Sequence, residues 1–391
     1  MIKRLYLLVI LSMLLVNLLP AEPVSAATYQ QIGGSSYYGE VVCPPDYYSG
    51  QSLDCIPAGP SQSIANIIAQ GIPYPVLDLP ASRPDPALAD LPIGFAKINI
   101  ESTTPAAIYS SLDAAVAGEN PGRFLQAGET VYVSYIQRTD VNGGHYVMLA
   151  SGEWMRASPG DYSRFSGLVF HSTPRNNFGW IIDQAVPRNA PGYAAQELPK
   201  MYYRENQVQV YQQVEMDGTT WYQIGADEWV ERRYIRQVVV NTTPPEGVDN
   251  GRWIEVNLYE QTLSAYDQGH LVFATLIATG AEPYFTRPGV HKIYLKKELE
   301  TMTGAFEADK SDYYYLADVP WTMYYDDARA IHGAYWRAVY GYPQSHGCVN
   351  LSIIDSHWLF DWAKDGDYVY VWDPSGATPT DPEFYSSVGA Y

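Results

Sequence analysis

The chain has 391 residues, of which 34 are tyrosine, 31 are glycine and 28 are proline, and only 17% are charged. This composition favours strands and turns over long surface helices, and the length suggests two or three domains. The formal net charge of -19 argues against a nucleic-acid partner, because such partners are held by clustered lysine and arginine.

Residues 1–26 have the pattern of a secretory signal peptide. Lys3 and Arg4 precede an almost uninterrupted apolar run over residues 5–19, and Val24-Ser25-Ala26 has the small residues of a cleavage site. The run is shorter than the roughly 20 residues that span a bilayer, so we expect cleavage and not a retained anchor. The mature chain is then secreted, and it contacts the membrane only through the signal peptide before cleavage.

Residues 27–91 are rich in proline, glycine and serine and show little periodicity, which is typical of an extended spacer. Cys43 and Cys55 lie close enough in sequence to close a small loop. We expect a disulfide between them, because two free thiols are rare in an oxidising compartment.

Residues 92–240 contain a weak internal repeat, in which the run Tyr146–Met155 matches the run Trp221–Val230. Each run follows a strand and a glycine-containing turn, which predicts two copies of one small β unit. These units resemble the SH3-like barrels found beside bacterial wall enzymes. Two interpretations remain open: the units bind wall polymer, or they form a rigid spacer whose tryptophans fill the cores.

Residues 250–373 begin with three strands, at 252–258, 262–266 and 271–279, whose short turns predict an antiparallel meander. A helix is predicted after Ser352, which forms a capping pair with Asp355. It presents Ile354, Trp358, Leu359 and Trp362 on one face and stops at Gly366, before a strand at 368–372. Residues 374–391 are expected to form a flexible tail.

Cys348 is the third cysteine and has no partner in the expected Cys43–Cys55 disulfide. It lies in the run Ser345-His346-Gly347-Cys348-Val349-Asn350. A nucleophilic cysteine needs an imidazole or a positive field to generate thiolate. We assign His332 as general base, because tertiary folding can place its ring against the sulfur. His346 then shapes the loop, and the N–H groups of His346, Gly347 and Cys348 form a possible oxyanion hole, with Gly347 allowing a tight turn.

The last zone resembles the L,D-transpeptidase family, with its YkuD-like catalytic domain. The resemblance is carried by Ile331-His332-Gly333, by the step of fourteen residues to His346, and by the run 345–350. Asn350 stands where many members have arginine, and Arg287 is inserted in a turn that carries Thr-Pro-x-Gly in the family. The expected fold is mainly β: a C-terminal β-sandwich with one marked helix, preceded by two small SH3-like units.

This resemblance implies a peptidoglycan cross-linking enzyme of the cell wall or periplasm. Cys348 attacks the peptide bond after the third residue of a tetrapeptide stem, which releases D-alanine and leaves a thioester. His332, held by the Gly333 carbonyl, accepts the thiol proton. Transfer to an amine of a second stem makes a cross-link, and transfer to water makes a carboxypeptidase. The resemblance further implies inhibition by carbapenems, and we expect no cofactor and no metal. The candidates for the donor site are Tyr324, Trp336, Ser345 and Asn350, since Trp336 lies just past His332 and Asn350 just past Cys348; for each aromatic residue, packing in the core is the open alternative.

Three alternatives compete with this interpretation. A zinc site from His332, His346 and Cys348 lacks a fourth ligand at a supporting spacing, although His291 or His357 could approach in the fold. A papain-like protease is a poor match, because the signature around its cysteine is missing and the histidine precedes the cysteine. A wall-binding protein with an inert site would not need the intact motif.

Overall fold

The computed structural model describes residues 60–98, 104–128, 130–160, 162–307, 309–310 and 313–386. The chain divides into two compact units, Met1–Ser63 and Ile64–Tyr391, and nearly all described residues belong to the second. The signal peptide and the Cys43–Cys55 loop predicted from the sequence lie outside the described residues. Within these ranges, no helix combines the length and the apolar character needed to cross a membrane.

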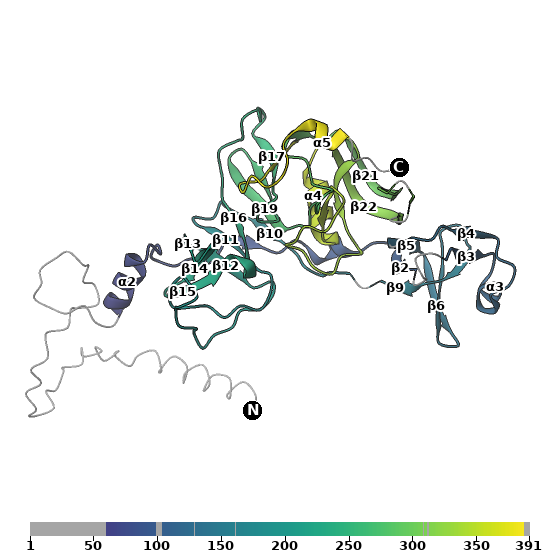
Figure 1. Cartoon of the computed structure of the whole chain (residues 1–391), viewed down its shortest axis with the longest axis horizontal. Helices are drawn as coiled ribbons and strands as arrows, with labels where there is room; N and C mark the ends of the chain where they lie inside the picture. The colour runs from purple at the N-terminus through teal and green to yellow at the C-terminus, as the bar shows by residue number, and fades with distance from the viewer. Residues whose placement is uncertain are drawn as a thin grey trace, which may run out of the picture. The chain divides into compact units, whose positions relative to one another are not determined.

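A seven-stranded sheet forms one layer of the C-terminal part, in the order β1-β10-β19-β18-β17-β25-β20. The predicted meander is confirmed, since β17, β18 and β19 pair antiparallel, and β25 joins β17 in parallel. Figure 1 labels β17 and β19 of this sheet in its green part. Their bounds are β1 Ala81–Ser82, β10 Leu168–Phe170, β17 Arg252–Asn257, β18 Thr262–Asp267, β19 His270–Leu276, β20 Gly289–Lys292 and β25 Tyr368–Trp372.

The second layer has the order β24-β23-β22-β5-β2-β9, with β21 paired to β22. β23 and β24 run parallel, whereas β22 pairs antiparallel with both β21 and β23. The bounds are β2 Gly94–Lys97, β5 Thr130–Tyr135, β9 Ser158–Pro159, β21 Leu295–Gly304, β22 Tyr314–Asp326, β23 Arg329–Gly333 and β24 Val349–Leu351.

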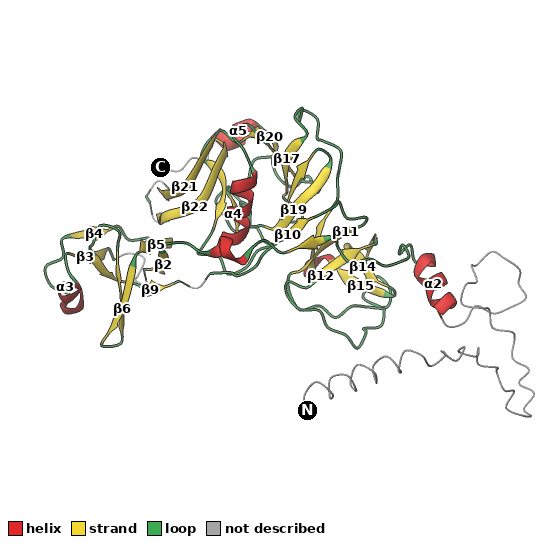
Figure 2. Cartoon of the chain, turned by 180° about the vertical axis from the view of Figure 1, so that it is seen from behind, coloured by secondary structure: helices red, strands yellow, loops and turns green. Residues whose placement is uncertain are grey.

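An apolar core between the two layers confirms the predicted sandwich. Buried side chains from both sheets form one cluster, which includes Ile254, Val256, Leu263, Met323, Ile331, Val349, Leu351 and Val369. Helix α4 (Ile353–Trp362) adds Leu359 to it and packs beside β22 and β23, as Figure 2 shows for β22. The predicted cap is also present, because Ser352 Oγ accepts from the Asp355 N–H at 3.2 Å. Helix α4 begins directly after β24, so its packing fixes the strand that follows Cys348.

The N-terminal region contains both hairpins that the internal repeat predicts. β6-β7-β8 and β13-β14-β15 are antiparallel meanders, and each first turn has two consecutive residues with positive φ: Asn142 with Gly143, and Asp217 with Gly218. Trp154 and Trp229 are both buried, as a core-filling role requires. The SH3-like character of these units stays a prediction.

The remaining elements complete this region. A five-stranded sheet has the order β4-β3-β8-β7-β6, and two three-stranded sheets have the orders β12-β11-β16 and β13-β14-β15. The bounds are α2 Pro60–Ala69, η1 Pro86–Ala89, β3 Ala106–Tyr109, α3 Leu112–Ala117, β4 Arg123–Leu125, β6 Gln137–Val141, β7 Gly144–Met148, β8 Trp154–Arg156, β11 Asn177–Ile181, β12 Gln207–Val210, β13 Gln212–Met216, β14 Thr219–Gly225, β15 Glu228–Glu231, η2 Arg232–Tyr234, β16 Ile235–Val238 and α5 Pro382–Ser386.

Two features differ from the domain scheme expected from the sequence. Strand β1 comes from the expected spacer and β10 from the expected tandem units, yet both extend the seven-stranded sheet, while β5 pairs with β22. The expected tail contains helix α5, and Tyr385 in it is only 7% exposed. Pairing with added strands satisfies backbone groups that an edge would leave open.

Candidate active site

Two neighbouring strands bring the predicted base and nucleophile to one edge of the second layer. In the parallel pair β23 and β24, Ile331 lies opposite Val349 and His332 lies opposite Asn350. Cys348 is the residue immediately before β24. Side chains two residues apart in a strand share a face, so His332, Asn350 and Cys348 belong to one patch of the sheet.

The His332 ring is buried and held by two hydrogen bonds. Its Nδ1 lies 3.1 Å from the Gly333 carbonyl oxygen and its Nε2 lies 3.2 Å from Asn350 Nδ2. The side chain is 2% exposed, and this burial lowers the pKa of His332 to about 4, an effect that the nearby Arg337 charge reinforces. The imidazole is therefore neutral at physiological pH.

Arg337 decides which ring nitrogen carries the proton. Its Nε donates to Asn350 Oδ1 at 3.1 Å and its Nη2 donates to the Gln344 carbonyl. A guanidinium only donates, so the oxygen of the Asn350 amide faces Arg337 and the NH₂ group faces His332. Nε2 must then accept, and Nδ1 carries the proton. Sequence reasoning missed Arg337, because an arginine five residues after a histidine has no motif of its own.

No hydrogen bond joins the Cys348 thiol to the His332 ring, so the expected thiol–imidazole pair is not formed in this arrangement. Sγ donates instead to the Ala328 carbonyl at 3.9 Å, and His332 Nε2 is taken by the Asn350 amide. Burial raises the pKa of Cys348, although the side chain remains partly exposed. Thiol and imidazole are thus both neutral in this arrangement, and each has another hydrogen-bond partner.

The loop before Cys348 is held by its own hydroxyl and by a neighbouring turn. Ser345 Oγ donates to the Cys348 carbonyl at 2.6 Å and accepts from the Gly347 N–H at 3.2 Å. Thr286 Oγ1 donates to the Gly347 carbonyl at 2.9 Å. Gly347 has φ of +116°, which only glycine adopts readily, so a tight turn is present here.

This loop geometry changes two expectations. The Gly347 N–H is already paired with Ser345, so the expected oxyanion hole has at most the His346 and Cys348 N–H groups as donors. Ser345 was expected to bind substrate, but it is buried and its hydroxyl holds the loop.

The aromatic residues predicted around the site fall into two places. Trp336 lies 5.6 Å from His332 between ring centroids, and Tyr324 interacts electrostatically with Cys348, with burial raising the pKa of Tyr324 to about 12. The exposed His346 instead stacks on Phe306, with centroids 4.5 Å apart, and lies 4.7 Å from the Tyr284 ring. His346 therefore joins an aromatic group beside the loop.

The described residues contain no group of three or more His, Cys, Asp or Glu side chains placed to hold a metal ion. The two supporting histidines of the zinc alternative are engaged elsewhere: His357 bonds the Leu88 carbonyl at 2.9 Å, and His291 lies 3.7 Å from Asp326.

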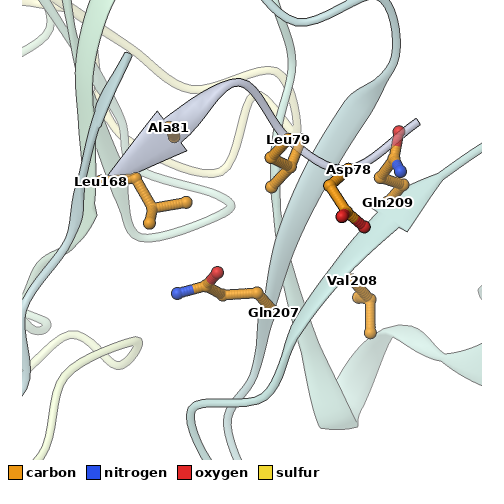
Figure 3. Close-up of a pocket in the computed structure, with 7 residues that line it drawn as sticks. All are labelled: Asp78, Leu79, Ala81, Leu168, Gln207, Val208 and Gln209. Carbon is orange, nitrogen blue, oxygen red and sulfur yellow. The ribbon is translucent and has the colours of Figure 1, made fainter. Parts of the chain in front are cut away.

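A cavity of about 270 Å³ lies away from the predicted site residues and is shown in Figure 3. Its lining comes from β10, β12 and the segment around β1: Asp78, Leu79, Ala81, Leu168, Gln207, Val208 and Gln209. None of these was predicted as a functional residue.

Residues 251–371 match the family model of the L,D-transpeptidase catalytic domain, YkuD. This segment is an L,D-transpeptidase catalytic domain. The YkuD domain contains both His332 and Cys348, and it contains β17 to β24 and α4. It accounts for about a third of the chain, and the N-terminal β units lie outside it.

Several similar solved structures are L,D-transpeptidases. A crystal structure from Stackebrandtia nassauensis is 24% identical, with 36% of this chain and 63% of that chain covered and a TM-score of 0.27. The catalytic domain from E. faecium is 29% identical, with 32% and 100% covered and a TM-score of 0.29, and its form acylated by ertapenem has the same values. The chain thus spans less than two thirds of the Stackebrandtia protein. A comparison with curated proteins finds no match.

Proposed function

We propose that this chain is a peptidoglycan L,D-transpeptidase with Cys348 as nucleophile. The YkuD match over residues 251–371 supports the reaction class. The observation that carries the proposal is the pairing of His332 and Asn350 across β23 and β24, with Cys348 at the strand end. It gives a neutral imidazole, with Nε2 as proton acceptor, beside a partly exposed thiol.

Acylation begins when the Cys348 side chain turns from the Ala328 carbonyl toward His332 and displaces the Asn350 amide from Nε2, whose single lone pair is then open to the thiol proton. The thiol proton passes to Nε2 while the sulfur attacks the carbonyl carbon after the third residue of a tetrapeptide stem. The Gly333 carbonyl accepts from Nδ1–H and steadies the imidazolium that forms. This proton then goes to the departing D-alanine nitrogen, and a thioester remains on Cys348.

Deacylation reverses these roles. An amine of a second stem attacks the thioester carbon, His332 accepts the amine proton, and the thiol leaves and takes that proton back. Attack by water at the same carbon releases a tripeptide, which is the carboxypeptidase outcome.

The compartment and the inhibitors follow from the same proposal. The signal peptide pattern over residues 1–26 supports export to the cell wall or periplasm. The catalytic domain from E. faecium has been solved acylated by ertapenem. We propose that carbapenems acylate Cys348 in the same manner, since they present a strained carbonyl to the thiol.

Incubation of the purified mature chain with a disaccharide tetrapeptide tests this function. We expect free D-alanine and a cross-linked dimer by mass spectrometry, and neither product from Cys348→Ala. A tripeptide without dimer would identify a carboxypeptidase. Release of no D-alanine by the folded wild-type chain would contradict the proposal and favour an inert wall-binding protein.

A further inference from the structure

The Cys348 sulfur rests against the start of β23, where it hydrogen-bonds to backbone groups of the strand and of the residue before it. Sγ donates to the Ala328 carbonyl at 3.9 Å, and the Ala330 backbone also hydrogen-bonds the sulfur, in a way that favours the ionised form. Arg329 lies between these two residues and interacts electrostatically with the sulfur. The thiol therefore faces a backbone donor and a cation from a single short segment.

Arg329 is a mostly buried cation with an unused donor. Its Nη1 lies 3.0 Å from Asp326 Oδ2, and its side chain is 12% exposed. Among the described residues, Arg329 Nε is buried and has no hydrogen-bond partner. A Cβ placed on Gly347 would lie 3.3 Å from this Nε, so the unused N–H is next to the residue that precedes the nucleophile. Buried donors are rarely left unpaired, so this one calls for a functional explanation.

The charge around Arg329 is not balanced. Asp326 is shared by two arginines, since Arg287 Nη1 lies 3.1 Å from Oδ1 while Arg329 takes Oδ2. His291 faces Oδ1 at 3.7 Å, and burial lowers its pKa, which favours its neutral form. One carboxylate therefore meets two permanent cations and by itself cannot neutralise both.

Two tyrosines of β22 also act on the sulfur. Tyr324 and Tyr325 of β22 face the sulfur, and burial raises the pKa of both. The Arg329 guanidinium lies 5.0 Å from the Tyr385 ring centroid, so helix α5 holds the cation in place without cancelling its charge. Arg329 is thus the cation that acts on Cys348.

We propose that Arg329 is a positioning residue that stabilises the Cys348 thiolate through its charge and its free Nε–H. The inference rests on the proposed role of Cys348 as nucleophile. In the reaction the thiol proton still passes to His332 Nε2, and no bond forms or breaks at Arg329. A cysteine whose pKa is raised by burial gains reactivity from such a field.

Alkylation of the full mature chain by iodoacetamide from pH 6 to 10, read on the Cys348 peptide by mass spectrometry, tests this role. Arg329→Gln should raise the apparent thiol pKa and slow alkylation at pH 7 by about 10-fold. Arg329→Lys should keep most of the wild-type rate. Arg287→Gln is the matched control, because Arg287 contacts the same carboxylate but is not among the charges that act on the sulfur, and it should slow alkylation clearly less than Arg329→Gln does.

The inference is overturned if Arg329→Gln titrates like the wild type, or if Arg287→Gln shifts the thiol equally. If Arg329→Gln shows no melting transition and is therefore unfolded, Asp326→Asn is the deciding variant, because it removes the carboxylate that pairs with Arg329 and leaves the positive charge in place. Faster alkylation at pH 7 supports the inference, and an unchanged or slower rate overturns it. No substrate is needed, so a chain that alkylates as expected but makes no cross-link would fail only the proposed function.

Discussion

Arg337→Gln should raise the pKa of His332 and move the acid limit of acylation upward. The guanidinium reaches the imidazole through one amide and two hydrogen bonds of 3.1 and 3.2 Å. Unit charges about 7 Å apart interact by about 2 kcal/mol at an effective dielectric constant near 20, or between one and two pKa units. This is an upper limit, because burial is the larger cause of the low pKa and remains in the variant, so the pKa of His332 should rise from about 4 by no more than about one unit.

The direction of the pH dependence follows from the chemistry of His332, because only the neutral imidazole can accept the thiol proton. Acylation requires neutral His332, so the rate is retained above the pKa and falls as the pH drops through it. The assay is the rate of ertapenem acylation from pH 4 to 8, followed by intact mass. Arg337→Lys is the matched control, because it keeps the positive charge and should fall in rate at the same acidic pH as the wild type. Its overall rate can be lower, since lysine cannot make both guanidinium hydrogen bonds, to Asn350 and to the Gln344 carbonyl.

An acid limit in Arg337→Gln that coincides with the wild type would refute this reasoning. Equal shifts in the glutamine and lysine variants would assign the effect to hydrogen bonding and not to charge. Both variants leave carbonyl oxygens unpaired, at a cost of about 1 to 3 kcal/mol each, so circular dichroism must first show that each is folded at 25 °C.

Other predictions follow from single residues. Gly347→Ala should slow acylation by about 10- to 100-fold, because φ of +116° disfavours alanine by about 1 to 3 kcal/mol and its Cβ meets Arg329 Nε. Gly366→Ala is the control: its φ is +88° and its Cβ enters open space, so it should lower the melting temperature but not the acylation rate. Ser345→Ala should slow acylation by about tenfold through loop disorder, whereas an unchanged rate would show that its two bonds do not hold the loop. Burial raises the pKa of Glu255 to about 7, above its ordinary 4.5, so its stabilising contribution is complete below pH 4.5 and is lost as the pH rises through 7. Glu255→Gln should therefore gain about 3 kcal/mol in unfolding free energy relative to wild type between pH 4 and 8, measured by urea titration, and a constant difference would contradict this.

The sequence was sufficient where a local pattern determines the structure. Alternation and glycine turns predicted β17 to β19, and the Ser352 cap with its apolar face predicted α4. The Nδ1 contact of His332 with Gly333, implied by the family resemblance, is a contact between adjacent residues that the extended backbone of β23 permits.

The sequence was insufficient where the structure depends on distant partners. β1 has two residues and β10 has three, too few to show alternation, so their pairing with the catalytic sheet could not be predicted. The orientation of Asn350 depends on Arg337, and the thiol direction depends on the Ala328 carbonyl. Both side-chain orientations are set by residues that lie far away in the sequence, so no local pattern predicts them.

The most direct test of the central claim is peptide mapping of the mature chain after exposure to ertapenem and, separately, to a tetrapeptide donor. We predict a single covalent adduct on Cys348 with each compound and none in Cys348→Ala, with His332→Ala acylated far more slowly. An adduct on another residue, or full acylation of a folded Cys348→Ala variant, would contradict the account.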